Sequence, residues 1–215
     1  MVQRKYGKEI LSEYDLGSYK IPSQIFALNF KEKNYSPRIV MVGAHDGVHG
    51  EQYGLMNYLE SLDDFQLYLI EPVEKFFNKL SQVYDKFGSK VHFLNYAITE
   101  RTGEDSMMDL GVMSKIGQGD LKVKTKTWFD FTSENKINEI DILILDCEGY
   151  EYEILKQINF KNNPVKAIRY EYLWLNKLMR WKLDWLLIKN KYKIKLCVND
   201  PKYNKVAYLK NINPK

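Results

Sequence analysis

RIVMVGAHDGVHG, residues 38–50, joins a short apolar run to a loop that contains glycine. An uninterrupted apolar run bounded by turn residues, here Ile39 to Val42, is typical of a buried strand of a parallel sheet. Gly43 and Gly47 can take backbone angles that are closed to other residues, so the chain can turn sharply there. In open α/β sheets, ligands bind beyond the carboxyl ends of the strands, where the strand order reverses. We therefore expect this loop to form the floor of a binding site.

The rest of the chain alternates between apolar runs typical of strands and segments with helical spacing. Further strands are expected at 65–70, 91–98, 139–146, 165–170, 192–198 and 205–209, and helices at 51–62, 73–87, 173–189 and in a segment that ends at Ile158. The last two strands flank a short turn, which predicts an antiparallel hairpin. The predicted fold is α/β: a doubly wound, Rossmann-like sheet of about seven strands, mostly parallel, with a C-terminal antiparallel hairpin.

Two regions are less regular. A leading helix is expected at about 22–32, after Pro22, and 99–121 is interpreted as a loop over one edge of the site, followed by a short strand at 122–127. No long linker or repeat is present. The prediction is one domain over residues 1–215, with a helical extension at 1–37 and the core at 38–215.

Composition narrows the class of protein. The 215 residues are 45% hydrophobic and 28% charged, which fits a soluble globular chain, and the net charge is only +4. The sequence shows no targeting signal and no apolar run near the roughly 18 residues that span a bilayer. Two cysteines are too few for a disulfide framework, so a reducing compartment and a cytoplasmic location are expected. The mild charge disfavours nucleic acid as a partner.

Acidic residues end several of the predicted strands: Asp46, Glu71, Asp146 and Glu171. Their side chains are expected to converge on one crevice. A carboxylate at the position of Glu71 can accept hydrogen bonds from a ribose diol, as in dinucleotide folds. The alternative is a surface carboxylate that caps the next helix, since Pro72 favours a helix start.

Asp146 and Glu148 flank Cys147 at the end of the central strand. One carboxylate could contact a ligand ammonium and the other a substrate hydroxyl, or the pair could hold a divalent cation through oxygen ligands. Alternatively, Asp146 positions the ligand and Glu148 is a first-turn helix charge. Cys147 is interpreted as a small apolar filler, because no histidine lies near it in the sequence.

His45 and His49 lie in the glycine loop, and His49 is a candidate general base because an unperturbed histidine titrates near pH 6.5. No histidine pair has the spacing of a zinc site, so no metal site is predicted, although a divalent cation stays open.

Trp174, Trp181 and Trp185 are interleaved with lysines in the C-terminal third. This pattern could indicate a nucleic-acid face. At helical spacing, however, it favours tryptophan and leucine in the core with lysines solvated outside. The predicted inward residues also include Leu175, Leu178, Met179, Leu183, Leu186 and Leu187.

Several segments resemble the FkbM-type methyltransferases, which are class I enzymes that use S-adenosylmethionine. They are VGAHDGVHGEQ (42–52), LIEPVEKFFNKL (69–80), NYAITERTGE (95–104), IDILILDCEGYEYEILKQINF (140–160) and VKAIRYEYLWL (165–175). The resemblance covers about residues 38–175, and its most specific parts are the I-E-P and D-x-E-G-Y-E segments.

The resemblance implies a role for each matching residue. Gly43, Ala44, His45 and Asp46 would lie along the methionine part of S-adenosylmethionine, Glu71 would bind its ribose, Asn95 and Ala97 would edge its adenine, and Asp146 would lie near its amino group. Glu148 would lie beside the reaction centre. Relatives often carry Glu-His after the fifth strand, where this chain has Glu171-Tyr172. The difference shifts the catalytic role toward Glu171 or Glu148.

The predicted function is an S-adenosylmethionine-dependent O-methyltransferase that acts on a hydroxyl of a sugar or glycan. Alternatives are a non-catalytic module that binds a glycan or a partner, an RNA methyltransferase, and a nicotinamide-dependent oxidoreductase, which the absence of G-x-G-x-x-G disfavours. The sequence leaves open a homodimer or a fusion with glycan-building domains.

Overall fold

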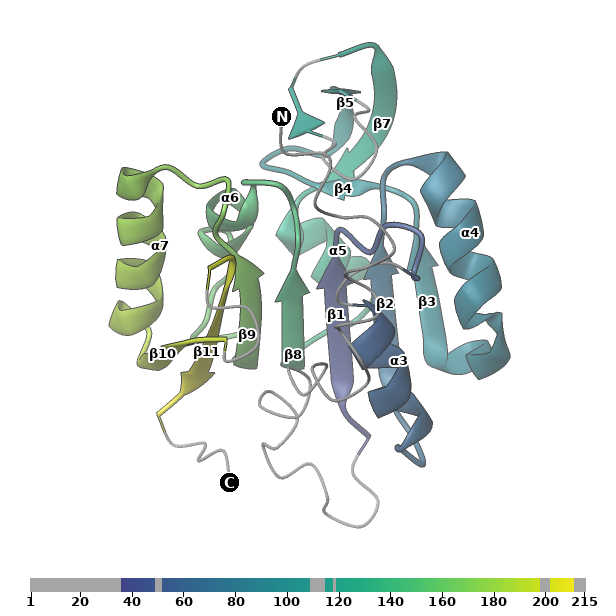
Figure 1. Ribbon diagram of the computed structural model, residues 1–215, viewed down its shortest axis with the longest axis horizontal. Helices are drawn as coiled ribbons and strands as arrows, with labels where there is room; N and C mark the ends of the chain where they lie inside the picture. Colours follow the sequence, from purple (N-terminus) through teal and green to yellow (C-terminus); the bar gives the residue numbers. More distant parts are fainter. Residues whose placement is uncertain (1–35, 49–51, 109–114, 118, 198–201, 211–215) are drawn as a thin grey trace.

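The computed structural model describes residues 36–48, 52–108, 115–117, 119–197 and 202–210. Its strands form one seven-stranded sheet and one four-stranded sheet, and helices pack on the large sheet (Figure 1). The strands of the large sheet are β1 (Arg38–Val42), β2 (Gln66–Ile70), β3 (Val91–Leu94), β8 (Ile140–Leu145), β9 (Val165–Glu171), β10 (Tyr192–Leu196) and β11 (Asn204–Leu209).

The strand order of the large sheet is β10-β11-β9-β8-β1-β2-β3. All neighbours are parallel except β11, which is antiparallel to both β9 and β10. The predicted doubly wound sheet with a C-terminal hairpin is therefore confirmed. The chain order runs outward from β1 through β2 to β3 and then continues on the other side of β1 at β8. This reversal places the switch point between β1 and β8, at the ends of two strands that are almost entirely buried.

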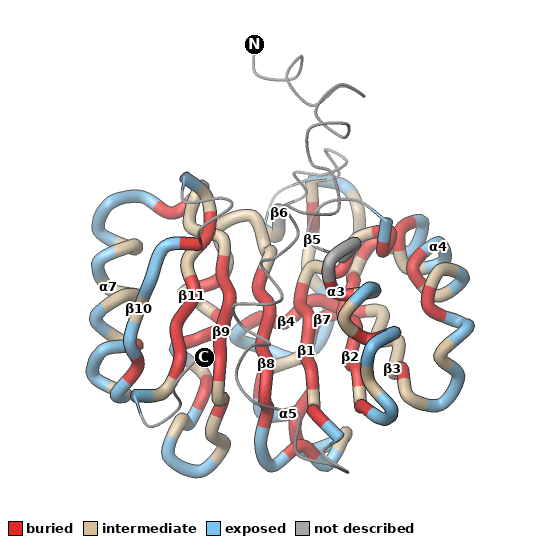
Figure 2. Tube along the Cα trace, turned by 60° about the horizontal axis from the view of Figure 1, so that its bottom comes forward, coloured by how far each residue is buried: buried red, intermediate tan, exposed pale blue. Residues whose placement is uncertain are grey.

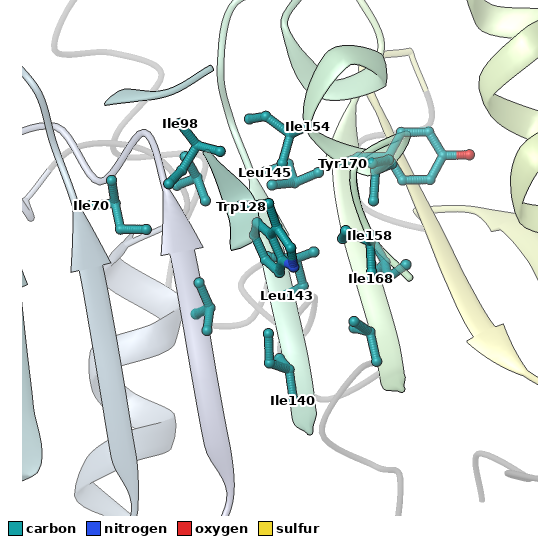
Figure 3. Close-up of a cluster of buried hydrophobic side chains, with 14 of the residues drawn as sticks. Ile70, Ile98, Trp128, Ile140, Leu143, Leu145, Ile154, Ile158, Ile168 and Tyr170 are labelled. Atoms are coloured by element: carbon teal, nitrogen blue, oxygen red, sulfur yellow. The ribbon is translucent and has the colours of Figure 1, made fainter. Parts of the chain in front are cut away.

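Helices cover both faces of this sheet (Figure 1). They are α3 (Gln52–Glu60), α4 (Glu74–Tyr84), the 3-10 helix η1 (Asp85–Lys90), α5 (Trp128–Glu134), α6 (Glu151–Leu155) and α7 (Lys177–Lys189). Alternate residues of β8 point to opposite faces. Leu143 packs in the cluster that contains Trp128 of α5 and Ile154 of α6 (Figure 3), whereas Ile144 belongs to the cluster that contains Leu80 of α4. This two-sided burial explains why the central strands are largely apolar, with Asp141 as a buried exception in β8.

The small sheet corrects two predictions. It contains β4 (Ala97–Ile98), β5 (Gly103–Met108), β6 (Lys115–Ile116) and β7 (Leu121–Lys126), in the order β4-β7-β5-β6. The expected strand at 91–98 is divided, because its last two residues pair with β7 rather than β2. In the described part of 99–121, the interpretation as a loop is wrong, since Gly103 to Met107 of β5 pair with β7. The short strand expected at 122–127 is confirmed as β7.

The boundaries of two helices differ less from the predicted ones. α6 ends at Leu155, before the expected Ile158, and α7 begins only at Lys177, where the Asn176 side chain accepts a hydrogen bond from Met179 N at 2.9 Å. The helix expected at 22–32 lies outside the described residues. Within the described part of the chain, no helix is both long and apolar enough to cross a bilayer.

Gly43 provides a test of this packing. A Cβ at position 43 would lie 1.8 Å from the carbonyl oxygen of Asp146, at a φ of +82°. We expect Gly43→Ala to lower the free energy of unfolding by at least about 3 kcal/mol, since both strain and a backbone clash oppose it. Gly88→Ala is the matched control: φ is +57°, but nothing lies within 4 Å. Urea denaturation should show a clearly smaller loss for Gly88→Ala; equal losses would contradict the clash.

Candidate active site

The glycine loop is held against both neighbouring strands. Gly43 N and Ala44 N donate to the carbonyl oxygen of Ile70 at 3.0 and 3.1 Å, and Asp146 N donates to the carbonyl oxygen of Val42 at 3.0 Å. The missing side chain of Gly43 lets the chain after β8 approach this closely. The loops after β1, β2 and β8 therefore meet at the switch point, as the sequence predicts.

Glu71 links two of these loops. Its Oε2 accepts a hydrogen bond from His45 N at 2.9 Å, and its Oε1 accepts one from Val73 N at 2.8 Å. The side chain is only 5% exposed. Burial and, to a smaller extent, the nearby charge of Asp46 raise its pKa to about 7, against the lowering effect of the two hydrogen bonds. Glu71 is therefore a buried carboxyl that organises the crevice, not a surface cap.

His45 and Asp46 lie side by side in the glycine loop. The His45 Nδ1 is 3.2 Å from Asp46 Oδ1, and its ring packs on Phe76 of α4 with 3.8 Å between centroids. Asp46 Oδ1 also lies 3.2 Å from Val48 N, which donates to it. The backbone of His45 has a φ of +46°, so the loop is tightly turned here. His49, the candidate base, lies outside the described residues.

Asn95 and Ala97 follow β3. The Asn95 side chain donates from Nδ2 to the carbonyl oxygens of Glu71, at 3.0 Å, and Pro72, at 3.2 Å. Ala97 is buried in β4 and pairs with Thr125 of β7. Asn95 thus fixes the chain after β2 against the chain after β3, beside the predicted site.

Three carboxylates converge beyond β8 and β9. One oxygen from each of Asp146, Glu148 and Glu171 lies within 4.8 Å of the other two. A tight turn produces this arrangement: Glu148 has a φ of +52°, and Gly149 follows with a φ of +103°. We call these three residues the acidic cluster.

The three carboxyl groups of the acidic cluster do not all ionise easily, because their negative charges would repel one another. Burial, together with the charges of Asp146, Glu148 and Glu151, raises the pKa of Glu171 to about 9, although the buried Arg169 opposes this. Three kinds of partner relieve the repulsion: a retained proton, a divalent cation with oxygen ligands, or a cationic group of an organic ligand.

Glu151 was not among the predicted site residues. It is 1% exposed, and its Oε1 accepts hydrogen bonds from Cys147 N at 2.9 Å and Gly149 N at 3.4 Å. It therefore fixes the turn that carries Glu148, and burial raises its pKa to about 7. Its sequence signal is a carboxylate at the start of a helix, directly after a glycine turn.

Cys147 fits its predicted role as a filler. Its Sγ lies 3.4 Å from the carbonyl oxygen of Val42, and burial with the nearby charges of Glu151 and Asp146 raises the pKa of the thiol. A protonated thiol is a poor nucleophile, so covalent chemistry at Cys147 is disfavoured.

The fold is that of the class I methyltransferases: a doubly wound sheet whose antiparallel strand, β11, lies between β9 and β10, with a glycine loop after β1. The profile of the methyltransferase FkbM domain family matches residues 42–184, so this chain belongs to that family. A comparison with curated proteins found no match.

Solved structures resemble the chain at low sequence identity. The methyltransferase FkbM of Methylobacillus flagellatus KT is 17% identical, with a TM-score of 0.54 over 80% of this chain and 43% of the other. The methyltransferase domain of METTL16 is 12% identical, with a TM-score of 0.53 over 90% of this chain and 66% of the other. The chain therefore spans less than half of the FkbM structure that it matches. At these identities, the likeness shows the fold alone.

Glu171 predicts a dependence of stability on pH. Its pKa is about 9 in the folded chain and 4.5 when unperturbed, so the folded state holds an extra proton between these values. The free energy of unfolding should therefore fall as the pH rises from about 5 to 9, and Glu171 should contribute on the order of 2 kcal/mol to the fall. Glu171→Gln, a neutral isostere, should flatten the curve.

The control for this titration is Glu60→Gln, at a half-exposed carboxylate that pairs with Lys86. Chemical denaturation of the ligand-free protein across the pH range measures all three curves. A native curve that is flat or rises with pH would contradict the raised pKa.

Proposed function

We propose that this chain is an S-adenosylmethionine-dependent O-methyltransferase whose acceptor is a hydroxyl of a sugar or glycan. The observation that carries the proposal is the acidic cluster, which lies at the carboxyl ends of β8 and β9 in a chain of a methyltransferase family. S-adenosylmethionine carries positive charge on its sulfonium and amino groups. A crevice with mutually repelling carboxylates is complementary to such a ligand.

The residues of the crevice fit the two ends of this cofactor. Each oxygen of Glu71 accepts one backbone N–H and has a second lone pair that can accept a ribose hydroxyl. The glycine loop from Gly43 to Asp46 would lie along the methionine part, with His45 in it, and Asp146 would face the amino group. Asn95 and Ala97 would edge the adenine.

When bound, S-adenosylmethionine would supply a methyl group on a sulfonium for transfer to the acceptor oxygen, with the thioether as leaving group. Glu171 or Glu148 would accept the hydroxyl proton, with His49 as a further candidate. In the ligand-free site, the raised pKa of Glu171 keeps a proton on it near neutral pH. A cationic ligand beside the cluster would lower that pKa, so that Glu171 becomes able to act as a base. The rest of the catalysis would come from positioning.

Cofactor binding is the first test. We expect the native chain to bind S-adenosylhomocysteine in calorimetric titration, and Glu71→Gln to weaken binding by about tenfold or more, because an amide nitrogen cannot accept a ribose hydroxyl. Glu60→Gln should bind as the native chain does. A native chain that releases no heat and shows no thermal stabilisation would refute the cofactor assignment.

Methyl transfer is the second test, made with labelled cofactor and a panel of sugars, nucleotide sugars and glycans. Glu171→Gln and Glu148→Gln should each bind S-adenosylhomocysteine within a few-fold of native, and the variant that lacks the base should lose turnover by about a hundredfold or more. Glu60→Gln should keep full turnover. Transfer to RNA alone, or cofactor binding without transfer to any hydroxyl, would favour the alternative functions instead.

A further inference from the structure

The outer side of α7 is apolar and exposed. Four side chains form one stripe along it, with exposed fractions of 59% for Leu178, 63% for Trp181, 52% for Trp185 and 55% for Ile188. At 3.6 residues per turn, they lie within an arc of about 80°. Leu183 and Leu187 lie on the opposite side of the helix and are fully buried against the sheet. Figure 2 shows exposed segments along the outer side of α7.

This stripe corrects a sequence prediction. Trp181, Trp185 and Leu178 were expected in the core, and Trp174 with them, but all four are exposed, Trp174 by 41%. The two rings on α7 lie against each other instead, with centroids 6.5 Å apart and an interplanar angle of 21°. A cluster of large exposed apolar side chains on one helix is typical of an interaction surface.

Basic side chains border the stripe. Lys177 and Lys189 are exposed, Lys182 is half-buried, and the Lys189 Nζ lies 5.2 Å from the centre of the Trp185 ring. The acidic residue of α7, Asp184, is already paired: its carboxylate accepts from Tyr170 Oη at 2.9 Å and from Lys205 Nζ at 2.5 Å. The charged side chains of α7 therefore carry a net positive charge.

We propose that the outer face of α7 docks on a membrane surface that contains anionic lipid. Indole rings favour the interface between headgroups and acyl chains, Leu178 and Ile188 gain from leaving water for the acyl region, and the lysines attract anionic headgroups.

Two other kinds of partner, nucleic acid and a second copy of the chain, fit the stripe less well. Nucleic acid would pair with the lysines and stack on the indoles, but it would not use two aliphatic side chains. A second copy of the chain would cover the stripe but would bring lysines against lysines. The proposed docking involves no residue of the acidic cluster or the glycine loop. Membrane binding is therefore independent of the proposed methyltransferase activity.

The test is co-sedimentation of the full chain with phosphatidylcholine vesicles, with and without phosphatidylglycerol. We expect binding that requires phosphatidylglycerol and weakens with salt. Trp181→Ser combined with Trp185→Ser should weaken it by at least about tenfold. The control is Phe129→Ser, which removes a 74% exposed aromatic ring from α5 and should leave binding unchanged.

Two further variants test whether vesicle binding requires the lysines of α7. The triple variant Lys177→Gln, Lys182→Gln and Lys189→Gln should weaken vesicle binding by about tenfold or more. The double variant Lys122→Gln and Lys124→Gln, at two exposed lysines of β7, should leave binding unchanged. Circular dichroism and thermal unfolding check that every variant is folded.

Three results would overturn the proposal: no vesicle binding by the native chain, equal binding to neutral vesicles, or native-like binding by the double tryptophan variant. Analytical ultracentrifugation that shows a dimer dispersed by the tryptophan substitutions, in a chain that does not bind vesicles, would assign the stripe to a second copy. RNA binding lost in the same variant, again without vesicle binding, would assign it to nucleic acid.

Discussion

The site depends on how closely the loops after β1, β2 and β8 approach one another at the carboxyl end of β1. Hydrogen bonds to the carbonyls of Val42 and Ile70 draw the loops after β1, β2 and β8 together. Position 43 must lack a side chain, because a Cβ there would overlap the carbonyl oxygen of Asp146. One carboxylate oxygen each of Asp146 and Glu148, in the loop after β8, then lies within 4.8 Å of one from Glu171 at the end of β9. The electrostatics of the crevice follow from this backbone packing as much as from the choice of side chains.

Much of the large sheet could be predicted, because its central strands are buried on both faces and read as continuous apolar runs. β5 could not be predicted in the same way: its sequence GEDSMM has one buried residue, Met107, and its pairing with β7 decides its conformation. In α7 the helical spacing was correct, but the helix carries two apolar stripes on opposite sides. Periodicity alone does not say which stripe faces the core, so Trp181 and Trp185 were misplaced.

The candidate site was predictable where position in the sheet decides it. The carboxyl ends of parallel strands lie at one edge, so Asp46, Glu71, Asp146 and Glu171 were expected to converge, and Asp146 and Glu171 do so in the acidic cluster. Glu151 was missed because its role depends on N–H groups that only the folded turn directs toward it. The protonation of Glu171 could not be predicted either, since it is set by burial and by neighbours that the fold assembles.

The position of β11 has a consequence for how the chain folds. The last described strand is inserted between β9 and β10, both of which precede it in the sequence. Until residues 204–209 arrive, one edge of β9 has no strand beside it, and β10 has no partner in the sheet. During synthesis, β1, β2 and β8 can pair early, but α7 and β10 must wait for a late insertion event. We therefore expect the half of the sheet that carries Glu171 to be the last to form, and its unpaired edge to be the part most exposed to misassembly while the chain is incomplete.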